Sequence, residues 1–297
     1  LYWISSRIGE EVVFDSGVDK IYFGINGQFG DIIIQEPCLR SIIEDNPDVK
    51  VVMGCNKKYA EALELYKNYH NNIVDFVVWE GYTTRCAPPN QWPTEKDKQY
   101  IENNLTDCPV FDVSPIHTQK DWALSMHQTE CFANTYGIKL KSKQIKLNRP
   151  PDIQKRQKTV AISLFPNWPN GGPKAFSTDT VANIVTCVSK MGYKVIHLNG
   201  PNEPDIPQAE KINGTYLEST KALLGSDLLI TGDTGMSWVA SAFQHPTVGL
   251  YAWGYNPVAK TSKNWQPVNP NAEYLEAFRV NDISKKDILS AIYGRLR

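Results

Sequence analysis

The chain has 297 residues, 41% of them hydrophobic and 21% charged, and its formal net charge at pH 7 is −1. That length is enough for two domains with sizeable cores, and the near-neutral charge argues against nucleic acid or anionic membranes as partners. No apolar run approaches the ~20 residues of a membrane span, so we expect at most peripheral membrane association. The six cysteines show no C-x-x-C spacing, which favours reduced thiols in a cytoplasmic protein over a metal site or disulfide framework.

The first 80 residues alternate between short apolar runs and stretches with helical spacing of apolar residues. The runs at 20–25, 50–53 and 73–79 predict buried strands, and the stretches at 32–45 and 59–69 predict helices. This β-α-β-α-β order indicates a parallel sheet with right-handed crossovers.

The alternation is lost over 81–108, a proline-bearing loop with one short predicted helix at 96–103. Long irregular segments of this kind are usually functional or mobile. A strand at 110–113 and a helix at 121–136, ended by a glycine, follow. The basic, proline-bearing segment 141–157 is predicted to be a linker whose charges are solvated, with an anion site as the alternative.

The second half of the sequence repeats the alternation, which predicts a C-terminal domain over 151–297 after an N-terminal domain over 1–150. In such an arrangement a ligand is expected between the domains, at the carboxyl ends of the strands. The predicted strands are 159–165, 193–198, 228–231 and 247–251; the predicted helices are 178–191, 217–224, 237–243 and 283–296, with a polar loop at 199–214.

Asp31 stands where the first strand gives way to the first helix, after Gly27 and Gly30. Glycines at such a point allow close approach of the backbone to a ligand. The carboxylate can act there as a general base, or it can be an ordinary helix N-cap, for which Asp is a favoured residue. With two glycines only, the loop lacks the G-x-G-x-x-G fingerprint of dinucleotide binding.

The turn Gly232-Asp233-Thr234-Gly235 lies between a predicted strand and a predicted helix. Free backbone N–H groups and the positive end of a helix bind anions at such a turn. We expect a diphosphate to be held by the Thr234 hydroxyl and by the N–H groups from Thr234 to Ser237, with a plain N-cap as the alternative.

Lys174 and Glu203 lie in loops that follow two predicted strands of the second half. The lysine can neutralise a phosphate, and the acid can accept hydrogen bonds from ribose or sugar hydroxyls. Each can also be an ordinary exposed loop residue. The loop aromatics Trp168, Trp253 and Tyr255 can stack on a base or sugar. The five histidines show no metal-ligand spacing, so no metal is expected.

Four segments resemble, in order, those of one known family. They are KIYFGINGQFGDIIIQEPCLRSI, PKAFSTDTVANIV, HLNGPNEPDI and SDLLITGDTGMSWVASAFQHPTVGLYA. They are similar to the Gly-Asp helix start, the Lys-x-Trp/Phe helix start, the Gly-x-x-Glu loop and the Asp-Ser/Thr-Gly segment of the ADP-heptose:lipopolysaccharide heptosyltransferases, glycosyltransferase family 9. The last segment is the most diagnostic of the four.

The resemblance implies an α/β protein with the GT-B fold, in which two Rossmann-like domains face a central cleft. It implies an inverting, metal-independent transfer of heptose or a similar sugar from a nucleotide-diphosphate donor such as ADP-heptose, with no further cofactor. The acceptor is a hydroxyl of a glycan, a lipid-linked molecule or a protein, and we expect its contacts in the segment 81–108. Asp31 becomes the general base on the acceptor side, with Gln28, Gly30 and Trp238 as acceptor or loop candidates.

On the donor side, the resemblance implies that Lys174, Thr234 and Gly235 contact the diphosphate. It implies a nucleoside contact for Glu203, and it makes Asp233 a residue that holds the turn or meets the donor sugar. The full donor-side set is Lys174, Glu203, Asp233, Thr234, Gly235, Met236 and Ser237.

Two residues depart from the family pattern and leave the donor sugar open. Trp238 stands where the family commonly has His, and Gly232 stands where it usually has Asn. Two other functions therefore remain alternatives. One is a GT-B-like nucleotide-sugar epimerase, and the other is a non-catalytic two-domain binder of a small anionic ligand.

Overall fold

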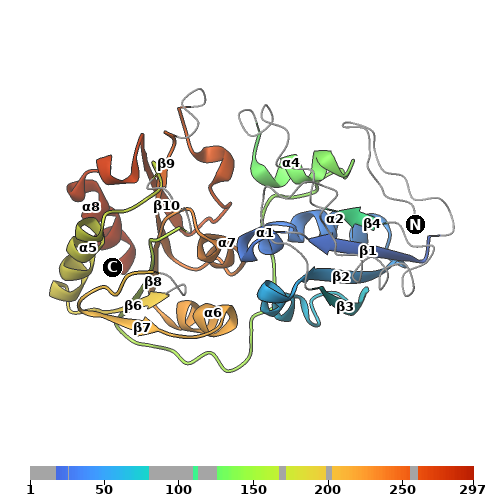
Figure 1. Cartoon of the computed structure of the whole chain (residues 1–297), viewed down its shortest axis with the longest axis horizontal. Coiled ribbons are helices and arrows are strands. Elements are labelled where there is room, and N and C mark those ends of the chain that lie inside the picture. The colour runs from blue at the N-terminus through green and yellow to red at the C-terminus, as the bar shows by residue number, and fades with distance from the viewer. Residues whose placement is uncertain are drawn as a thin grey trace. The chain divides into compact units, whose positions relative to one another are not determined.

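The computed structural model describes residues 18–25, 27–79, 110–112, 126–166, 172–198, 203–254 and 260–297. The chain divides into two units, Leu1–Arg149 and Pro150–Arg297 (Figure 1). The segment 81–108, with the short helix predicted at 96–103, and the loop aromatics Trp168 and Tyr255 lie outside the described residues.

The N-terminal unit holds a sheet of four parallel strands in the order β3-β2-β1-β4. Its central strands are buried apart from Lys20 and Lys50 at their starts, which is typical of parallel strands covered on both faces. The predicted strands are confirmed, with β2 running further than expected. They are β1 (Lys20–Ile25), β2 (Lys50–Asn56), β3 (Ile73–Trp79) and β4 (Val110–Asp112).

The single helix predicted at 32–45 is wrong, because the structure has two helices, α1 (Phe29–Ile34) and α2 (Glu36–Asp45). They are separated at Gln35. Pro37, in the first turn of α2, explains the break. Proline has no N–H to donate, and its ring clashes with the carbonyl group four residues earlier, so a continuous helix through this point is disfavoured.

Two further helical segments of this unit differ from the sequence prediction. The segment predicted at 59–69 is a 3₁₀ helix, η1 (Lys57–Tyr66). Helix α4 (Gln128–Thr135) is shorter than the predicted 121–136, of which 121–125 lie outside the described residues. It begins where His127 acts as N-cap, its Nδ1 accepting the N–H of Thr129 at 3.2 Å. Gly137 follows with a φ of 64°, the left-handed conformation that ends helices.

The C-terminal unit holds six parallel strands in the order β10-β9-β8-β5-β6-β7. Numbered within the unit, this is the 3-2-1-4-5-6 order of Rossmann-like sheets, with the direction of winding reversing between β5 and β8. The strands are β5 (Thr159–Ser163), β6 (Lys194–Leu198), β7 (Ala209–Ile212), β8 (Leu228–Thr231), β9 (Thr247–Ala252) and β10 (Ala272–Ala277).

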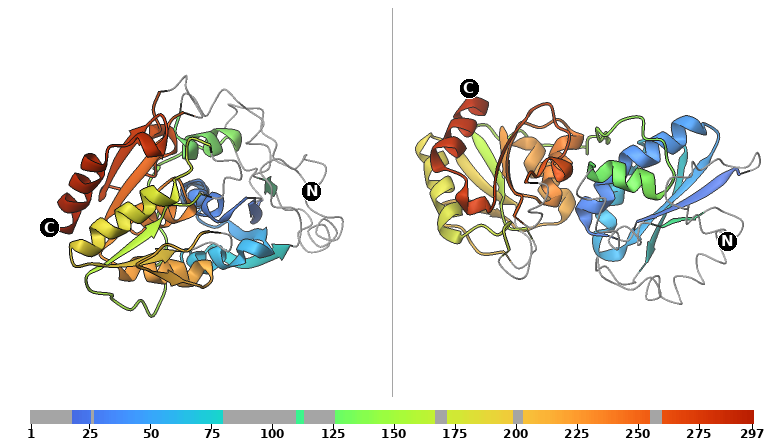
Figure 2. Two further views of the ribbon diagram at one scale, coloured as in Figure 1. Left: turned by 60° about the vertical axis from the view of Figure 1, so that its left-hand side comes forward. Right: turned by 90° about the horizontal axis from the view of Figure 1, so that it is seen from above.

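Helices cover both faces of this sheet (Figure 2). Helices α5 and α8 pack on one face over a core of Val, Ile and Leu side chains from β5, β8 and β9, whereas α6 and α7 pack against each other and contact strands of the sheet. The helices are α5 (Thr178–Lys190), α6 (Tyr216–Gly225), α7 (Gly235–Ala242) and α8 (Lys285–Leu296), with short 3₁₀ turns η5 (Lys263–Trp265) and η6 (Val280–Asp282).

Strand β7 lies within the loop predicted at 199–214, so that prediction is wrong over Ala209–Ile212. The sequence AEKI has no apolar run, because an edge strand is covered on one side only and its side chains stay half-exposed. Strand β10, at the opposite edge, is half-exposed for the same reason and was also missing from the prediction.

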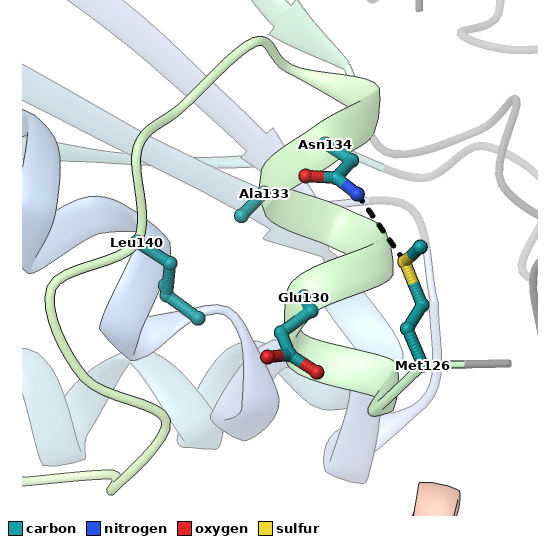
Figure 3. A pocket seen from close by; sticks show the side chains of 5 residues that line it. All are labelled: Met126, Glu130, Ala133, Asn134 and Leu140. Carbon is teal, nitrogen blue, oxygen red and sulfur yellow. Dashed lines mark hydrogen bonds between the residues drawn. The ribbon is translucent and has the colours of Figure 1, made fainter. Parts of the chain in front are cut away.

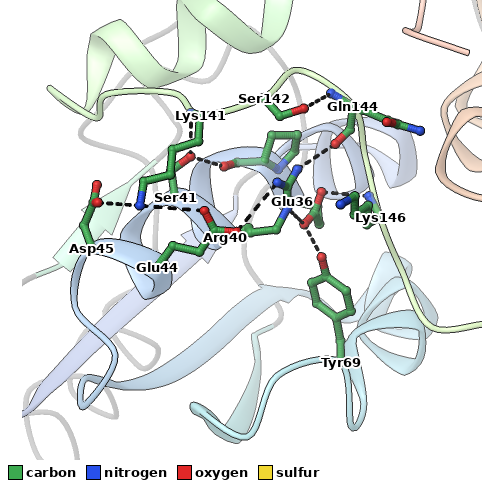
Figure 4. A network of polar contacts seen from close by, with 11 residues as sticks. Glu36, Arg40, Ser41, Glu44, Asp45, Tyr69, Lys141, Ser142, Gln144 and Lys146 are labelled. Atoms are coloured by element: carbon green, nitrogen blue, oxygen red, sulfur yellow. Dashed lines mark hydrogen bonds and ion pairs between the residues drawn. The ribbon is translucent and has the colours of Figure 1, made fainter.

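The segment after α4 is bound to the N-terminal unit through a buried carboxylate (Figure 4). Glu36 Oε1 accepts hydrogen bonds from Arg40 Nε at 2.8 Å and from the Tyr69 hydroxyl, and Glu36 Oε2 accepts the N–H of Lys146 at 2.9 Å. Arg40 also donates to the carbonyl of Gln144 at 2.7 Å. The first part of the basic segment 141–157 is therefore fixed to α2 rather than solvated throughout.

Desolvation dominates the electrostatics of this network. Burial raises the pKa of Glu36, and the hydrogen bonds from Arg40, Tyr69 and Lys146 act against that rise.

Within the part of the chain that the structure describes, no helix is long and apolar enough to cross a bilayer.

The Glu36 network predicts a large difference between two acids of the same helix. Glu36→Ala leaves the buried Arg40 without its main acceptor, so we expect it to lower the free energy of unfolding by about 3–5 kcal/mol. Glu44 contacts the same arginine at 3.9 Å but is 41% exposed, and Glu44→Ala should cost less than about 1 kcal/mol. Urea unfolding measures both, and equal losses would contradict the assignment.

Candidate functional site

In the C-terminal unit, the strands that flank the reversal of winding end side by side. Ser163 closes β5, Thr231 closes β8, and the two residues are paired in the sheet. Open α/β sheets bind ligands outside the carboxyl ends of strands at such a reversal. The turn predicted as an anion site, 232–235, follows Thr231 directly and therefore lies at this point of the sheet.

Three hydroxyl groups gather at the turn. Thr234 Oγ1 lies 3.0 Å from Ser163 Oγ and 3.0 Å from Thr231 Oγ1. Thr234 is the N-terminal flanking residue of α7, yet its side chain makes no capping hydrogen bond to that helix. Thr234 thus occupies the N-cap position that the alternative assigned to this turn, but its hydroxyl bonds to Ser163 and Thr231 rather than to the helix. Ser163 was not predicted, because nothing in its local sequence marks it.

Lys174 and Asp233, two residues predicted for the site, form an ion pair across the sheet edge. Each side chain is 16% exposed. Lys174 comes from the connection between β5 and α5, and Asp233 from the turn before α7, so the pair joins the two loops that flank the reversal. The structure thus brings Lys174, Asp233 and Thr234 together at one end of β5 and β8.

The loop of Lys174 is held by Asn281, which the sequence did not identify. Asn281 Nδ2 donates to the carbonyl of Ala175 at 2.9 Å, and its Oδ1 accepts the N–H of Ser177 at 3.1 Å. The N–H of Val280 also donates to the carbonyl of Pro173 at 2.9 Å. These contacts fix the backbone on both sides of Lys174.

Gly232 stands in contact with an aromatic ring. A Cβ atom added at Gly232 would lie 2.9 Å from Phe176 Cε2, which is too close for a real contact. An asparagine here, as the family usually has, would need the Phe176 ring to move. Glycine at position 232, in place of the asparagine of the family pattern, therefore leaves room for the Phe176 ring.

The remaining predicted residues of α7 are buried, apart from Gly235 at the start of the helix. Met236, Ser237 and Trp238 are 6%, 2% and 5% exposed. The N–H and the hydroxyl of Ser237 both donate to the carbonyl of Thr234, at 3.1 and 2.7 Å, and the N–H of Thr234 donates to the carbonyl of Gly232 at 2.9 Å. Two of the N–H groups predicted to hold the diphosphate are therefore hydrogen-bonded within the turn. Gly235 is half-exposed at the start of the helix.

Glu203 lies after β6, the strand next to β5, at the same carboxyl edge of the sheet. Its Oε2 is 3.0 Å from Nε2 of His197, a residue of β6 that is 1% exposed. Glu203 is therefore not an ordinary exposed loop acid, because a buried partner holds one of its oxygens.

In the N-terminal unit, the strand order reverses between β1 and β4, and the loop that carries Asp31 follows β1. Asp31 is the third residue of α1 and is 3% exposed, and its Oδ2 accepts the N–H of Gln28 at 2.9 Å. Gln28, not Asp31, occupies the N-cap position. Gly30 lies half-buried in the first turn of the same helix.

The N-terminal unit also has a pocket beside α4 (Figure 3). It is lined by Met126, Glu130, Ala133, Asn134 and Leu140, none of which was predicted for the site. Asn134 Nδ2 lies 3.2 Å from the Met126 sulfur, and Glu130 accepts the N–H of the helix cap at 2.9 Å. Among the described residues, no group of three His, Cys, Asp or Glu side chains is placed to hold a metal ion.

Several solved structures are similar in fold to this chain. No family model and no curated protein sequence matches the chain. A glycosyl transferase family 9 protein from Veillonella parvula is similar in structure, with a TM-score of 0.68 at 14% identity over 94% of this chain and 97% of the other. ADP-heptose LPS heptosyltransferase II of E. coli has a TM-score of 0.63 at 12% identity, covering 93% of this chain and 98% of its own.

The E. coli heptosyltransferase WaaC, solved with ADP, is similar to the same degree. Its TM-score is 0.62 at 11% identity, over 92% of this chain and 99% of that chain. At such low identity the likeness establishes the fold, and the resemblance predicted from the four sequence segments is confirmed at that level.

The contact between Gly27 and Asp31 predicts a position that tolerates no side chain. A Cβ atom at Gly27 would lie 2.5 Å from Asp31 Cβ, which cannot rotate away because it is fixed to the backbone. We expect Gly27→Ala to lower the free energy of unfolding by roughly 1–3 kcal/mol through this overlap.

Gly294 of α8 is the matched control, because a Cβ atom there meets nothing within 4 Å. Alanine in a helix is more favourable than glycine by up to about 1 kcal/mol, so Gly294→Ala should be neutral or stabilising. Chemical denaturation of both variants measures the contrast. A Gly27→Ala variant as stable as the parent would show that the Asp31 loop is not packed as described.

Proposed function

We propose that this protein is an inverting, metal-independent glycosyltransferase that moves a sugar from a nucleotide-diphosphate donor to a hydroxyl acceptor. The observation that carries the proposal is the placement of Lys174, Asp233 and the non-capping Thr234 hydroxyl at the start of α7, where the winding of the C-terminal sheet reverses. The shared fold with heptosyltransferases supports it.

The donor diphosphate is proposed to lie at the N-terminus of α7. Backbone N–H groups and the positive end of the helix dipole attract anions there, and the Thr234 hydroxyl and the Lys174 ammonium add a hydrogen bond and a positive charge. Charge accumulates on the diphosphate as it leaves, so these fixed groups bind the departing group more tightly and lower the barrier.

Asp31 is proposed as the general base that removes the proton of the acceptor hydroxyl. The hydrogen bond from Gln28 fixes the carboxylate at the carboxyl end of β1. A positioned base typically contributes about 10²–10⁴-fold to the rate. The base and the diphosphate site belong to different units in this proposal, so transfer requires that Asp31 and the groups that bind the diphosphate act on the same pair of substrates.

For the donor we propose an adenosine diphosphate sugar such as ADP-heptose. E. coli WaaC has been solved with ADP and with ADP-2-deoxy-2-fluoro heptose, and it shares the fold of this chain. The acceptor is proposed to be a hydroxyl of a glycan, a lipid-linked molecule or a protein, encountered in the cytoplasm. The buried Trp238 replaces the histidine that the family commonly has, so the sugar contacts at this position differ from the family pattern.

The diphosphate site predicts nucleotide-dependent stabilisation. Ligand present at 100 times its dissociation constant adds about 2.7 kcal/mol to the unfolding free energy, so ADP should raise the melting temperature in a thermal-shift panel that includes UDP and GDP. Lys174→Ala should remove most of that rise, whereas Lys190→Ala, in the last turn of α5, should retain it. A larger response to UDP or GDP would contradict the choice of ADP.

The base predicts a separation of binding from turnover. Asp31→Asn keeps the size of the side chain but removes the basic carboxylate, so sugar transfer should fall by at least about 10²-fold while ADP binding is unchanged. Product mass spectrometry and calorimetry measure the two quantities. Normal transfer by this variant would overturn the base assignment. Conversion of the donor without acceptor would instead indicate an epimerase, and binding without donor consumption would indicate a binding protein.

A further inference from the structure

His197 is a buried polar side chain with one hydrogen-bond partner among the described residues. It is 1% exposed, and it lies on the same face of β6 as Val195, which belongs to the apolar core of the unit. Its Nε2 lies 3.0 Å from Glu203 Oε2, and the ring of Phe165 lies 5.7 Å away, centroid to centroid. Among the described residues, Nδ1 has no hydrogen-bond partner.

A histidine at this position makes the folded state less stable than an apolar residue would. A buried polar atom without a partner destabilises the folded state, and a leucine would fill similar space without that loss. Because an ionised carboxylate only accepts hydrogen bonds, the ring proton belongs on Nε2, where it faces Glu203, and Nδ1 is left as the unpaired acceptor. Among the described residues, Glu203 is therefore the one hydrogen-bond partner of the ring.

The His197 contact orients the Glu203 carboxylate at the carboxyl end of β6. Glu203 lies at the carboxyl end of β6, next to β5, and its side chain is 19% exposed. The His197 contact takes up Oε2, which fixes the plane of the carboxylate and leaves Oε1 for another donor. Two adjacent hydroxyl groups, as on a ribose ring, are donors that a fixed carboxylate can accept together.

We propose that His197 is a positioning residue that orients Glu203 to accept the hydroxyl groups of the donor ribose, so that the site selects ribonucleotides over deoxyribonucleotides. The inference rests on the proposed function, because it assumes a nucleotide at this edge of the sheet. His197 touches no substrate and acts only through Glu203.

Other groups near His197 are accounted for. Asp205, two residues after Glu203, is paired with Lys211 of β7 at 2.6 Å, and Lys211 is the register partner of His197. That ion pair is exposed, with Asp205 83% accessible, so it contributes little to holding the loop. Asp205→Asn therefore serves as a control that removes a nearby carboxylate without touching the His197–Glu203 contact.

The test compares the binding of ADP, 2′-deoxy-ADP, 3′-deoxy-ADP and inorganic diphosphate by titration calorimetry. The parent protein should bind ADP about tenfold more tightly than at least one of the deoxy analogues, the effect of one hydrogen bond to a charged group. His197→Leu should reduce that ratio to near one and leave the affinity for inorganic diphosphate unchanged. Asp205→Asn should keep the full ratio.

A matched pair of amides separates positioning from a merely structural role. The side chain of His197→Gln can place an N–H near the position of Nε2 and should retain most of the ribose preference, whereas the shorter His197→Asn should lose it. These two variants replace His197→Leu if that protein does not fold. In a Glu203→Ala background, His197→Leu should change the ratio no further, because the residue through which it acts is gone.

The outcomes separate the two levels of inference. If the parent binds no nucleoside diphosphate, the proposed function fails. If the parent prefers ADP and His197→Leu keeps the same preference, the role of His197 is overturned while the proposed function stands. If His197→Leu shifts the ratio equally with and without Glu203, the effect is structural and the positioning role is also overturned.

Discussion

The reversal of winding between β5 and β8 is the constraint on which the rest of the C-terminal site depends. Right-handed crossovers carry the chain to opposite faces on the two sides of this point, so the loops that follow β5 and β8 diverge and leave their backbone groups accessible. Ser163 and Thr234, 71 residues apart in the chain, lie within hydrogen-bond distance for this reason. The Lys174–Asp233 ion pair joins the loops that follow the same two strands.

Much of the fold follows from the sequence, since strands buried on both faces are mostly apolar. The runs at Lys20–Ile25 and Leu228–Thr231 were recognisable for that reason. The edge strands β7 and β10 were not, because half-exposed strands need no such run. The break before Pro37 shows a different limit: helical periodicity continues across it, and only the missing N–H and the ring of proline divide the helix.

The candidate site was predictable only where its residues are contiguous. The turn at 232–235 combines glycines, a hydroxyl and a helix start within a few residues, so local chemistry identifies it. The supports around it come from distant parts of the chain. Asn281 bonds to the Lys174 loop across 106 residues, and Phe176 packs on Gly232 through a ring contact that no motif encodes. His197 was missed because a lone histidine in an apolar strand resembles any other core residue.

The Lys174–Asp233 ion pair also affects how fast the donor binds. Opposite charges held together act at long range as a dipole, and the field of a dipole fades with distance faster than that of a single charge. A doubly charged donor approaching this edge is therefore not drawn in by the lysine from afar. The ammonium becomes effective only when the phosphate arrives and competes with Asp233 for it. Capture of the donor should accordingly depend only weakly on ionic strength, unlike electrostatically steered association.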